Sequence, residues 1–496
     1  MDQQSRLSSA EVAATGIAGL DYILGGGLVR NRLYLIEGVP GSGKTTLAMQ
    51  FLLEGVRLGE PVLYVTLSET DEELRAVAAS HDWSLEGISI HELAPSEEAL
   101  DRQQQLSMFH PSEVELDETT RAILERVEEI RPSRVVLDSM SEMRLLAGTP
   151  LRFRRQVLAL KQYFSGRGCT VVLLDDNTAM TADLQIHSIA HATVTLEQLL
   201  PEYGAERRRL MVGKYRGVAF CGGYHDYVIR RGGLQVFPRF VAADIRRASR
   251  WEVMSTGIPE LDTLFGGGID HGTSTLIMGA AGTGKSTLAC QMAASAALQG
   301  KRSVLFLFDE SLSTFLIRAR GLQMDLDAHL ESGAVVLHQV DPAELSPGEF
   351  ATRVRSAAQD DGARVIVIDS LNGYLNAMPG ERHLTVQLHE LLAYMGQLGV
   401  ATFLVAVQHG LLGSDMTSVV DASYLADSVL LLRYFEAEGE VRQAISVVKK
   451  RSGPHERTIR EFRIESGIRI GPALREFRGV LTGVPNYRGA PDPLMR

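Results

Sequence analysis

The stretch Gly38–Thr45 reads GVPGSGKT, and a second stretch of the same kind, Gly279–Ser286, reads GAAGTGKS. Both fit the pattern GxxxxGK[ST]. Each follows an apolar run and precedes a helix-prone segment, Thr46–Glu54 in the first copy and Thr287–Ala297 in the second. In this context the pattern predicts a phosphate-binding loop between a strand and a helix. A glycine-rich turn that arises by chance would not occur twice in register, so we expect two nucleotide sites.

The residue types of each loop indicate how a nucleotide is held. The glycines let the backbone curl so that its N–H groups point at phosphate oxygens, aided by the N-terminus of the following helix. Lys44 and Lys285 are expected to reach the β- and γ-phosphates of ATP. The residues expected to bind the nucleotide are Gly38, Gly41, Ser42, Gly43, Lys44, Thr45 and Thr46 in the first loop, and Gly279, Gly282, Thr283, Gly284, Lys285, Ser286 and Thr287 in the second.

The loops belong to a duplicated domain. TGIAGLDYILGGGL begins at Thr15 and TGIPELDTLFGGGI begins at Thr256, with the same offset that separates the two loops. A repeat of this length is far longer than the roughly 20–50 residues of a solenoid unit. We therefore predict two domains, residues 1–245 and 246–496, the second with a short tail. The joint is expected near Ala242–Met254, a polar, arginine-rich stretch that suits an exposed connector.

Apolar runs of strand length alternate with longer periodic segments in both copies, which is typical of a parallel sheet covered by helices. Each copy is therefore predicted to be an α/β domain with a mostly parallel sheet flanked by helices. The predicted strands are Arg32–Ile36, Val62–Leu67, Arg134–Leu137 and Thr170–Leu174, followed in the second copy by Thr275–Met278, Ser303–Phe308, Arg364–Ile368 and Ala401–Val405.

Four residues are expected to hold a magnesium ion. The hydroxyls of Thr45 and Ser286 end the two phosphate-binding loops. Asp138 and Asp369 end strands rich in valine and isoleucine, where a carboxylate can hold the shell of Mg²⁺ through water. An aspartate at a strand end is more often a cap, but the matching context in both copies favours the metal role.

Hydrolysis of ATP needs a residue that activates the attacking water near the γ-phosphate. In sheets of this type, a glutamate after the strand next to the phosphate-loop strand is well placed. YVTLSE ends at Glu69 and LFLFDE ends at Glu310, at the same offset as the loops. This shared register favours a catalytic role over a solvated loop glutamate, so Glu69 and Glu310 are the candidate water-activating residues.

The composition narrows the classes of function. The 496 residues are 45% hydrophobic and 22% charged, as in an ordinary globular protein. The formal net charge of −11 opposes non-specific binding to nucleic acid or to an anionic membrane. The start of the chain is polar, and no run approaches the roughly 18 apolar residues that span a bilayer. We therefore expect a cytoplasmic protein that binds neither nucleic acid nor membrane.

The order of these motifs resembles that of the KaiC family, whose members contain two tandem RecA-like P-loop domains. The resemblance runs over nearly the whole chain. It includes the TGIxxLD openings, both loops, the strand-end acidic residues, and the late segments LMVGKYRG and VVKKRSGPHERTIREF. It implies a double-ring homohexamer that binds ATP between subunits, hydrolyses it slowly in both rings and phosphorylates itself in the C-terminal ring. The resemblance also implies that the protein binds a Kai-type or other signalling protein.

The resemblance carries further residues over to this chain. Lys214 and Arg216, with Lys449 and Arg451, match basic residues that reach from one subunit towards the γ-phosphate of its neighbour. In cis they would be an ordinary solvated strand face. If they instead reach the neighbouring subunit, they would stabilise the negative charge on its γ-phosphate and so take part in catalysis.

Two positions depart from the family pattern. The family has two adjacent glutamates at the catalytic position, where this chain has Ser68–Glu69 and Asp309–Glu310. Asp309 therefore gives the second copy a second carboxylate, and proton abstraction from a hydroxyl remains feasible there. The phosphorylated Ser–Thr pair aligns with Ser423 and Tyr424, and Ser418 is a nearby candidate.

Two other classes of function remain open at this stage. One is a DNA-dependent motor or recombination ATPase, since such proteins share the core. The acidic charge opposes it, and salt-dependent binding to single strands would support it. The other is a nucleotide-gated scaffold that recruits a signalling partner with negligible turnover, which an ATPase assay would distinguish.

Overall fold

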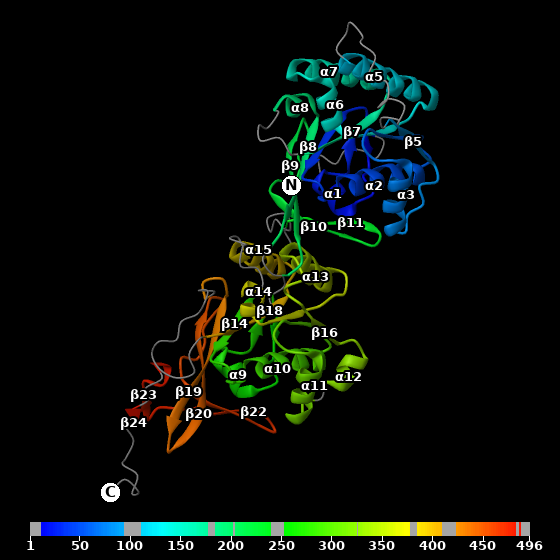
Figure 1. Ribbon diagram of the computed structural model, residues 1–496. Helices are drawn as coiled ribbons and strands as arrows, with labels where there is room; N and C mark the ends of the chain where they lie inside the picture. Colours follow the sequence, from blue (N-terminus) through cyan, green and yellow to red (C-terminus); the bar gives the residue numbers. More distant parts are fainter. Residues whose placement is uncertain are drawn as a thin grey trace, which may run out of the picture. The chain divides into compact units, whose positions relative to one another are not determined.

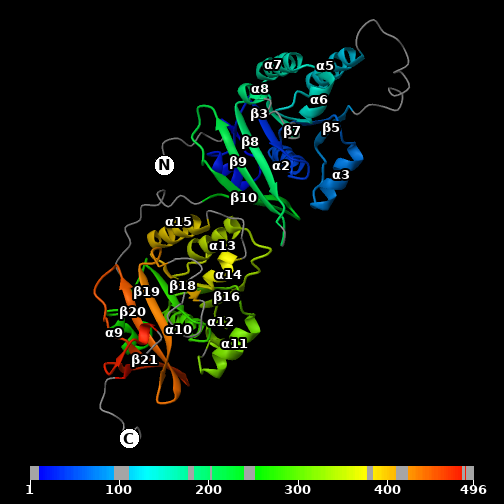
Figure 2. The same cartoon turned by 60° about the vertical axis from the view of Figure 1, so that its left-hand side comes forward.

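The computed structural model describes residues 11–93, 111–176, 184–201, 204–239, 252–324, 326–376, 384–408, 423–482 and 486–487. Within the chain two compact units separate, Met1–Arg239 and Phe240–Arg496. Most of the predicted joint, Ala242–Met254, lies outside the described residues. Each unit contains one large sheet flanked by helices (Figures 1 and 2).

The first unit contains a nine-stranded sheet with the order β11-β10-β9-β8-β3-β7-β6-β4-β5. The strands from β8 to β5 are parallel, and β9, β10 and β11 extend the sheet as antiparallel strands. The elements are β1 Val12–Ala13, α1 Ala18–Ile23, β2 Leu28–Val29, β3 Leu33–Gly38, α2 Lys44–Arg57, β4 Val62–Thr66, α3 Asp71–Ser80, β5 Ile88–Glu92, α5 Pro111–Ile130, β6 Arg134–Asp138, α6 Met140–Ala147, α7 Pro150–Gly166, β7 Thr170–Asp176, α8 Leu184–Ile189, β8 Ala192–Leu199, β9 Arg207–Tyr215, β10 Tyr224–Arg230 and β11 Gly233–Phe237.

The second unit repeats this topology in a nine-stranded sheet with the order β16-β15-β17-β18-β14-β19-β20-β21-β22. Its elements are β12 Val253–Met254, α9 Pro259–Leu264, β13 Ile269–Asp270, β14 Ser274–Gly279, α10 Lys285–Leu298, β15 Ser303–Leu307, α11 Leu312–Gly321, α12 Asp327–Glu331, β16 Val335–Gln339, α13 Pro347–Gln359, β17 Val365–Asp369, α14 Leu371–Asn376, α15 Leu384–Gln397, β18 Ala401–Val407, β19 Ser428–Ala437, β20 Glu440–Lys450, β21 Arg460–Glu465, β22 Gly467–Ala473, β23 Phe477–Arg478, the 3₁₀-helix Val480–Thr482 and β24 Asn486–Tyr487.

Helices cover both faces of each sheet, as the alternation of the buried strand residues requires. In β3, Tyr34 and Ile36 join the apolar cluster that contains α1, α2 and α3, whereas Leu33 and Leu35 join the cluster that contains α5 to α8 (Figure 1). In the second unit α9 to α12 lie on one face and α13 to α15 on the other. Burial on both faces explains why these strands read as nearly continuous apolar runs.

The predicted fold class is confirmed, and all eight predicted strands are present with small shifts at their ends. One detail of the prediction is wrong. The strand that precedes Glu69, β4, is not next to the phosphate-loop strand β3, whose neighbours are β7 and β8. Consecutive parallel strands can be separated in a sheet because a crossover helix spans the strands between them, and here β6 and β7 fill that space.

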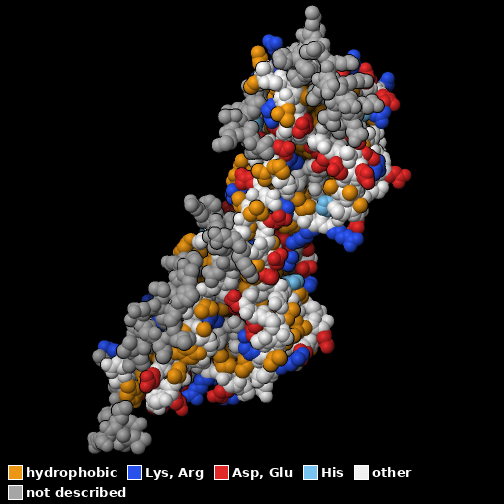
Figure 3. All heavy atoms as spheres, in the orientation of Figure 1, with side chains coloured by type: hydrophobic (Ala, Val, Ile, Leu, Met, Phe, Trp, Pro, Cys, Tyr) orange, Lys and Arg blue, Asp and Glu red, His pale blue; other side chains and the backbone are white. Residues whose placement is uncertain are grey.

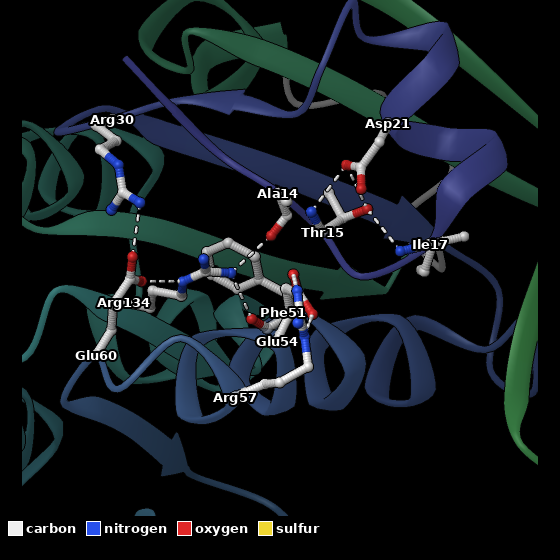
Figure 4. Close-up of polar contacts among 10 residues, drawn as sticks. All are labelled: Ala14, Thr15, Ile17, Asp21, Arg30, Phe51, Glu54, Arg57, Glu60 and Arg134. Atoms are coloured by element: carbon white, nitrogen blue, oxygen red, sulfur yellow. Dashed lines mark hydrogen bonds and ion pairs between the residues drawn. The ribbon is translucent and has the colours of Figure 1, made fainter. Parts of the chain in front are cut away.

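The TGIxxLD openings are held by a carboxylate that closes the loop (Figure 4). Both the backbone nitrogen and Oγ1 of Thr15 donate to Oδ1 of Asp21 at 2.8 Å. In the second copy the backbone nitrogen of Thr256 donates to Oδ1 of Asp262 at 2.7 Å. The shared motif is thus explained by the turn that leads into the first helix of each unit.

A buried arginine beneath α2 distinguishes the first unit from the second (Figure 4). Arg134, 0% exposed, donates from Nε to Oε2 of Glu60 at 2.5 Å. Its Nη1 donates to the carbonyls of Ala14 and Phe51 at 2.6 and 2.8 Å. At the same register of the second sheet stands Val365. A fully buried guanidinium is tolerated here because it has both a charge partner and carbonyl acceptors.

We expect Arg134→Met to destabilise the first unit by about 3–5 kcal/mol, because it leaves Glu60 and two buried carbonyls without this donor. Amide hydrogen exchange of α2 in the full chain measures the effect, and α10 of the second unit serves as the internal reference. Arg167→Met, which removes an exposed pair with Glu128, should cost at most about 1 kcal/mol. Equal effects of the two substitutions would contradict this account of Arg134.

Candidate functional site

The first phosphate-binding loop connects the end of β3 to the start of α2. Gly43 caps α2 with φ 94°, and a Cβ atom there would lie 2.5 Å from Cδ1 of Ile229. Only glycine fits both the left-handed backbone and this close approach. The first amides of α2 have no acceptor within the helix, so they face the loop as donors for an anion.

The two predicted magnesium ligands of the first unit meet. Oγ1 of Thr45, on the first turn of α2, lies 3.3 Å from Oδ2 of Asp138 at the end of β6. Tyr64 also donates to this oxygen at 2.5 Å. Burial raises the pKa of Asp138, and the hydrogen bonds from Tyr64 and Thr45 oppose that rise. A buried carboxylate beside a hydroxyl fits the hard oxygen ligands that Mg²⁺ prefers.

Glu69 lies at the same edge of the sheet, in the loop between β4 and α3. Its backbone is fixed by Thr66, whose hydroxyl accepts from the Glu69 amide at 2.9 Å. One carboxylate oxygen, Oε2, is buried and has no hydrogen-bond partner among the described residues. Burial raises the pKa of Glu69, the nearby Asp138 adds to the rise, and Lys44 opposes it. Oε2 of Glu69 therefore has acceptor capacity that no described residue uses.

A residue that the sequence reasoning missed completes the first loop. Nζ of Lys44 lies 2.8 Å from Oδ1 of Asp176, and it also donates to the carbonyls of Gly38 and Val39. Asp176 ends β7, directly opposite Gly38 in the neighbouring strand. The sequence does show an aspartate at the end of the apolar run that forms β7. It could point to Lys44 only once β7 was known to lie next to β3.

The second loop has the same backbone and a different polar setting. Gly284 caps α10 with φ 90°, and Nζ of Lys285 donates to the carbonyl of Ala280 at 2.6 Å. The residue opposite Gly279 on the neighbouring strand is Val407, in the place that Asp176 takes in the first unit. Burial lowers the pKa of Lys285 to about 8, and Asp369 opposes the shift.

The predicted metal ligands of the second unit also come together. Ser286 hydrogen-bonds to Asp369 at the end of β17. Burial raises the pKa of Asp369, and this hydrogen bond opposes the rise. Among the described residues no three or more His, Cys, Asp or Glu side chains form a metal cluster. A cation at either loop would therefore take one carboxylate and one hydroxyl, with its remaining ligands from phosphate and water, which is how Mg²⁺ is bound with nucleotides.

The two carboxylates Asp309 and Glu310 follow β15 at the same edge, each with a different partner. Ser370, which follows Asp369, donates from Oγ to Oδ2 of Asp309. Glu310 accepts from Nη1 of Arg318, on α11, at 2.9 Å to Oε1. Both carboxylates are thus oriented by side chains of their own unit.

The four basic residues lie at the opposite edge of each sheet from the loop of their own unit. Lys214 pairs with Thr193 on β8, which pairs with Leu35 on β3, three residues before Gly38. At roughly 3.3 Å per residue, this register puts Lys214 about 10 Å from the loop along the strand direction. Its Nζ donates to the carbonyl of His187, before β8.

The basic residues of the second unit are arranged in the same way. Nζ of Lys449 donates to the carbonyls of Ser423 and Ala426 at 2.7 Å, and Arg451 donates to the carbonyl of Tyr424 at 2.8 Å. In the first unit Arg216 likewise donates to the carbonyl of Ser188 at 2.6 Å. The structure therefore does not bring these basic residues to the loop of their own unit.

Two of the three phosphosite candidates can be described. Tyr424 is 54% exposed and Ser423 half-buried, both in the segment before β19 that Lys449 and Arg451 hold. β19 pairs with β14 from Ser428 opposite Thr275, so the candidates precede the end of the sheet remote from Gly279. Ser418 lies outside the described residues.

None of the described helices has the length and apolar character needed to cross a membrane.

Comparison with known proteins assigns the chain to a family. A family model described as the KaiC ATPase matches residues 13–240 and again residues 254–475. The circadian clock protein KaiC3 of Synechocystis sp. is 26% identical over 98% of this chain and 96% of its own length. The circadian clock oscillator protein KaiC of Thermostichus vulcanus is 27% identical over 96% and 93%, and that of Synechococcus elongatus is 26% identical over 95% and 91%. The chain therefore belongs to the KaiC family of ATPases, with two copies of the family's ATPase domain.

Proposed function

We propose that each domain, 1–245 and 246–496, binds ATP with Mg²⁺ at its phosphate-binding loop and hydrolyses it. Lys44 and Lys285 hold the β- and γ-phosphates, and the loop amides hold the remaining phosphate oxygens. The pairs Thr45–Asp138 and Ser286–Asp369 hold the cation, which would neutralise the charge that develops on the phosphates. The meeting of a hydroxyl and a buried carboxylate in both units supports this assignment.

Hydrolysis requires that a water attack the γ-phosphorus while a base takes its proton. Glu69 has this role in the first domain and Glu310 in the second. For Glu69 the supporting observation is its buried oxygen with no partner among the described residues, beside a lysine that reaches phosphate. A positioned general base contributes about 10²–10⁴-fold to a rate.

We further propose a homohexamer in which each nucleotide lies between two subunits. One observation carries this proposal. Lys214, Arg216, Lys449 and Arg451 lie at the sheet edge away from the loop of their own unit, an arrangement that suits a γ-phosphate held by a second copy. Charge supplied from a neighbour in this way is the logic of an arginine finger.

The same geometry supports self-phosphorylation between copies. Ser423 and Tyr424 adjoin Lys449 and Arg451, at the edge that would face the neighbour's nucleotide. Asp309 or Glu310 would take the proton of the accepting hydroxyl. Transfer of phosphate would then let the protein act in the cytoplasm as a timing or signalling switch, with a Kai-type or other signalling protein as its partner.

A DNA-dependent ATPase is the less favoured alternative. In the basic cluster of β9, Arg208 pairs with Glu206 and Arg209 with Glu197, so these charges are already neutralised. On the face shown in Figure 3, acidic and basic side chains are interspersed and do not form one basic stripe. This pattern gives a phosphate backbone little to bind.

Self-phosphorylation is tested by mapping phosphosites after incubation of the purified protein with Mg²⁺ and ATP. We expect phosphate on Ser423 or close by, and its loss in Lys285→Ala, because that substitution removes the phosphate-binding lysine of the second domain. Glu69→Gln, which leaves both phosphate-binding loops intact, is the matched control in the first domain. Unchanged incorporation in Lys285→Ala would refute the assignment of kinase activity to the second domain, and no phosphate in the unsubstituted protein would leave an ATPase without kinase activity.

Assembly is tested by analytical ultracentrifugation in the presence of Mg²⁺ and ATP. We expect Lys44→Ala to weaken the hexamer, because the first domain would lose the nucleotide that lies between its subunits. Lys285→Ala, with the first loop intact, should retain assembly. A hexamer of unchanged stability in Lys44→Ala would show that nucleotide in the first domain does not hold the subunits together.

We expect Asp176→Asn to raise the affinity of the first domain for ATP about tenfold, since Lys44 would no longer be held by a carboxylate that repels phosphate. Titration with a fluorescent ATP analogue, in a Lys285→Ala background, reports this domain alone. Asp82→Asn removes the same charge from an exposed pair at the far end of α3 and should have no effect. The reciprocal Val407→Asp should weaken binding in the second domain, and equal affinities throughout would contradict a role for Asp176.

A further inference from the structure

The second site contains an ion pair that involves a proposed catalytic residue. Nη1 of Arg318 lies 2.9 Å from Oε1 and 2.7 Å from Oε2 of Glu310. Arg318 projects from α11, the helix that begins two residues after Glu310. One guanidinium nitrogen therefore lies between the two oxygens that would take a proton from water.

The first site lacks this pair. The helices α3 and α11 correspond residue for residue, since each begins two residues after its glutamate and contains ten residues. The position of Arg318 is Val77 in the first unit, a partly buried side chain packed against the apolar core. Glu69 is left with one buried oxygen that has no partner among the described residues. The two sites thus differ in whether the proposed water-activating glutamate forms an ion pair with an arginine: Glu310 does so with Arg318, whereas the arginine position is valine beside Glu69.

Arg318 is held in place by its surroundings. Its guanidinium lies 5.2 Å from the ring centroid of Phe315, one turn earlier on α11. Its Nη2 is buried and makes no hydrogen bond to any described residue, so Glu310 is the acceptor that fixes this side chain. A charge-assisted contact in a partly buried setting is stronger than one between exposed groups.

The chemistry of hydrolysis gives this pair a consequence. The water oxygen forms a bond to the γ-phosphorus, the bond between that phosphorus and the β–γ bridging oxygen breaks, and the water proton goes to the carboxylate, which leaves ADP and inorganic phosphate. A carboxylate that takes this proton loses its negative charge, so its charge-assisted contact with Arg318 is weakened. Because Nη1 lies within contact of both oxygens, one acceptor site on each is already directed at Arg318 while the pair is formed.

We propose that Arg318 is a positioning residue of the second site that holds Glu310 away from the attacking water, and so keeps hydrolysis there slower than in the first site. The proposal rests on the catalytic role given to Glu310 above. It concerns one side chain that the second domain has and the first domain replaces by valine.

The test uses the full chain with hydrolysis in the first site removed by Glu69→Gln, so that the remaining ATPase activity reports the second site. In this background we expect Arg318→Val to raise kcat at least threefold with little change in KM, and Arg318→Gln to act in the same direction. Arg318→Lys, which keeps the charge, should restore the low rate. Arg320 lies on the same helix as Arg318 and forms an exposed ion pair with Asp327. Arg320→Gln removes this pair and should leave kcat unchanged.

A kcat that is unchanged or lower in both Arg318→Val and Arg318→Gln would overturn the proposal. The double variant Glu69→Gln, Glu310→Gln is measured alongside. If it keeps the activity of the unsubstituted protein, the catalytic assignment of the glutamates fails, and the inference about Arg318 fails with it. If it is inactive and the Arg318 variants match their background, the inference fails alone.

Discussion

The parallel pairing of the loop strand with two neighbours, β3 with β7 and β8 in the first unit and β14 with β18 and β19 in the second, is the constraint on which the rest of each candidate site depends. Parallel strands end at one edge, so the loop after Gly38, the carboxylate of Asp138 and the loop of Glu69 converge there although they are far apart in sequence. The helix that follows the loop adds its unpaired amides at the same place. The sheet thus brings together the residues of the proposed anion and cation sites, which lie far apart in sequence.

The two units place different side chains on this common backbone. In the first, Asp176 neutralises the loop lysine, and Glu69 keeps a buried oxygen without a partner among the described residues. In the second, the loop lysine has a lowered pKa and Glu310 is neutralised by Arg318. In the first unit an ion pair therefore holds the lysine proposed to bind phosphate. In the second unit an ion pair holds the glutamate proposed to activate water. A duplicated fold can in this way contain two sites of unequal activity.

The opposite edge of each sheet carries the basic residues proposed to act on the nucleotide of a neighbouring subunit. Lys214 in one unit and Lys449 in the other extend away from their own loops and bind backbone carbonyls of the preceding segment. Strand register fixes this separation from the loop of the same unit. The proposed sharing of each nucleotide between subunits would give these residues a role and would tie catalysis to assembly.

The sequence by itself determined the fold class, the duplication, both phosphate-binding loops and the strand-end aspartates, because each depends on short-range spacing or on a repeated register. It also located Glu69 and Glu310 by their shared offset. It did not determine the strand order, and the expectation that β4 adjoins β3 was wrong. Only the tertiary structure brought Asp176 to Lys44 and Arg318 to Glu310, and only it separated the basic residues from their own loops. The order in which strands enter a sheet and the direction in which helices pack on it decide these contacts. No spacing along the chain encodes them.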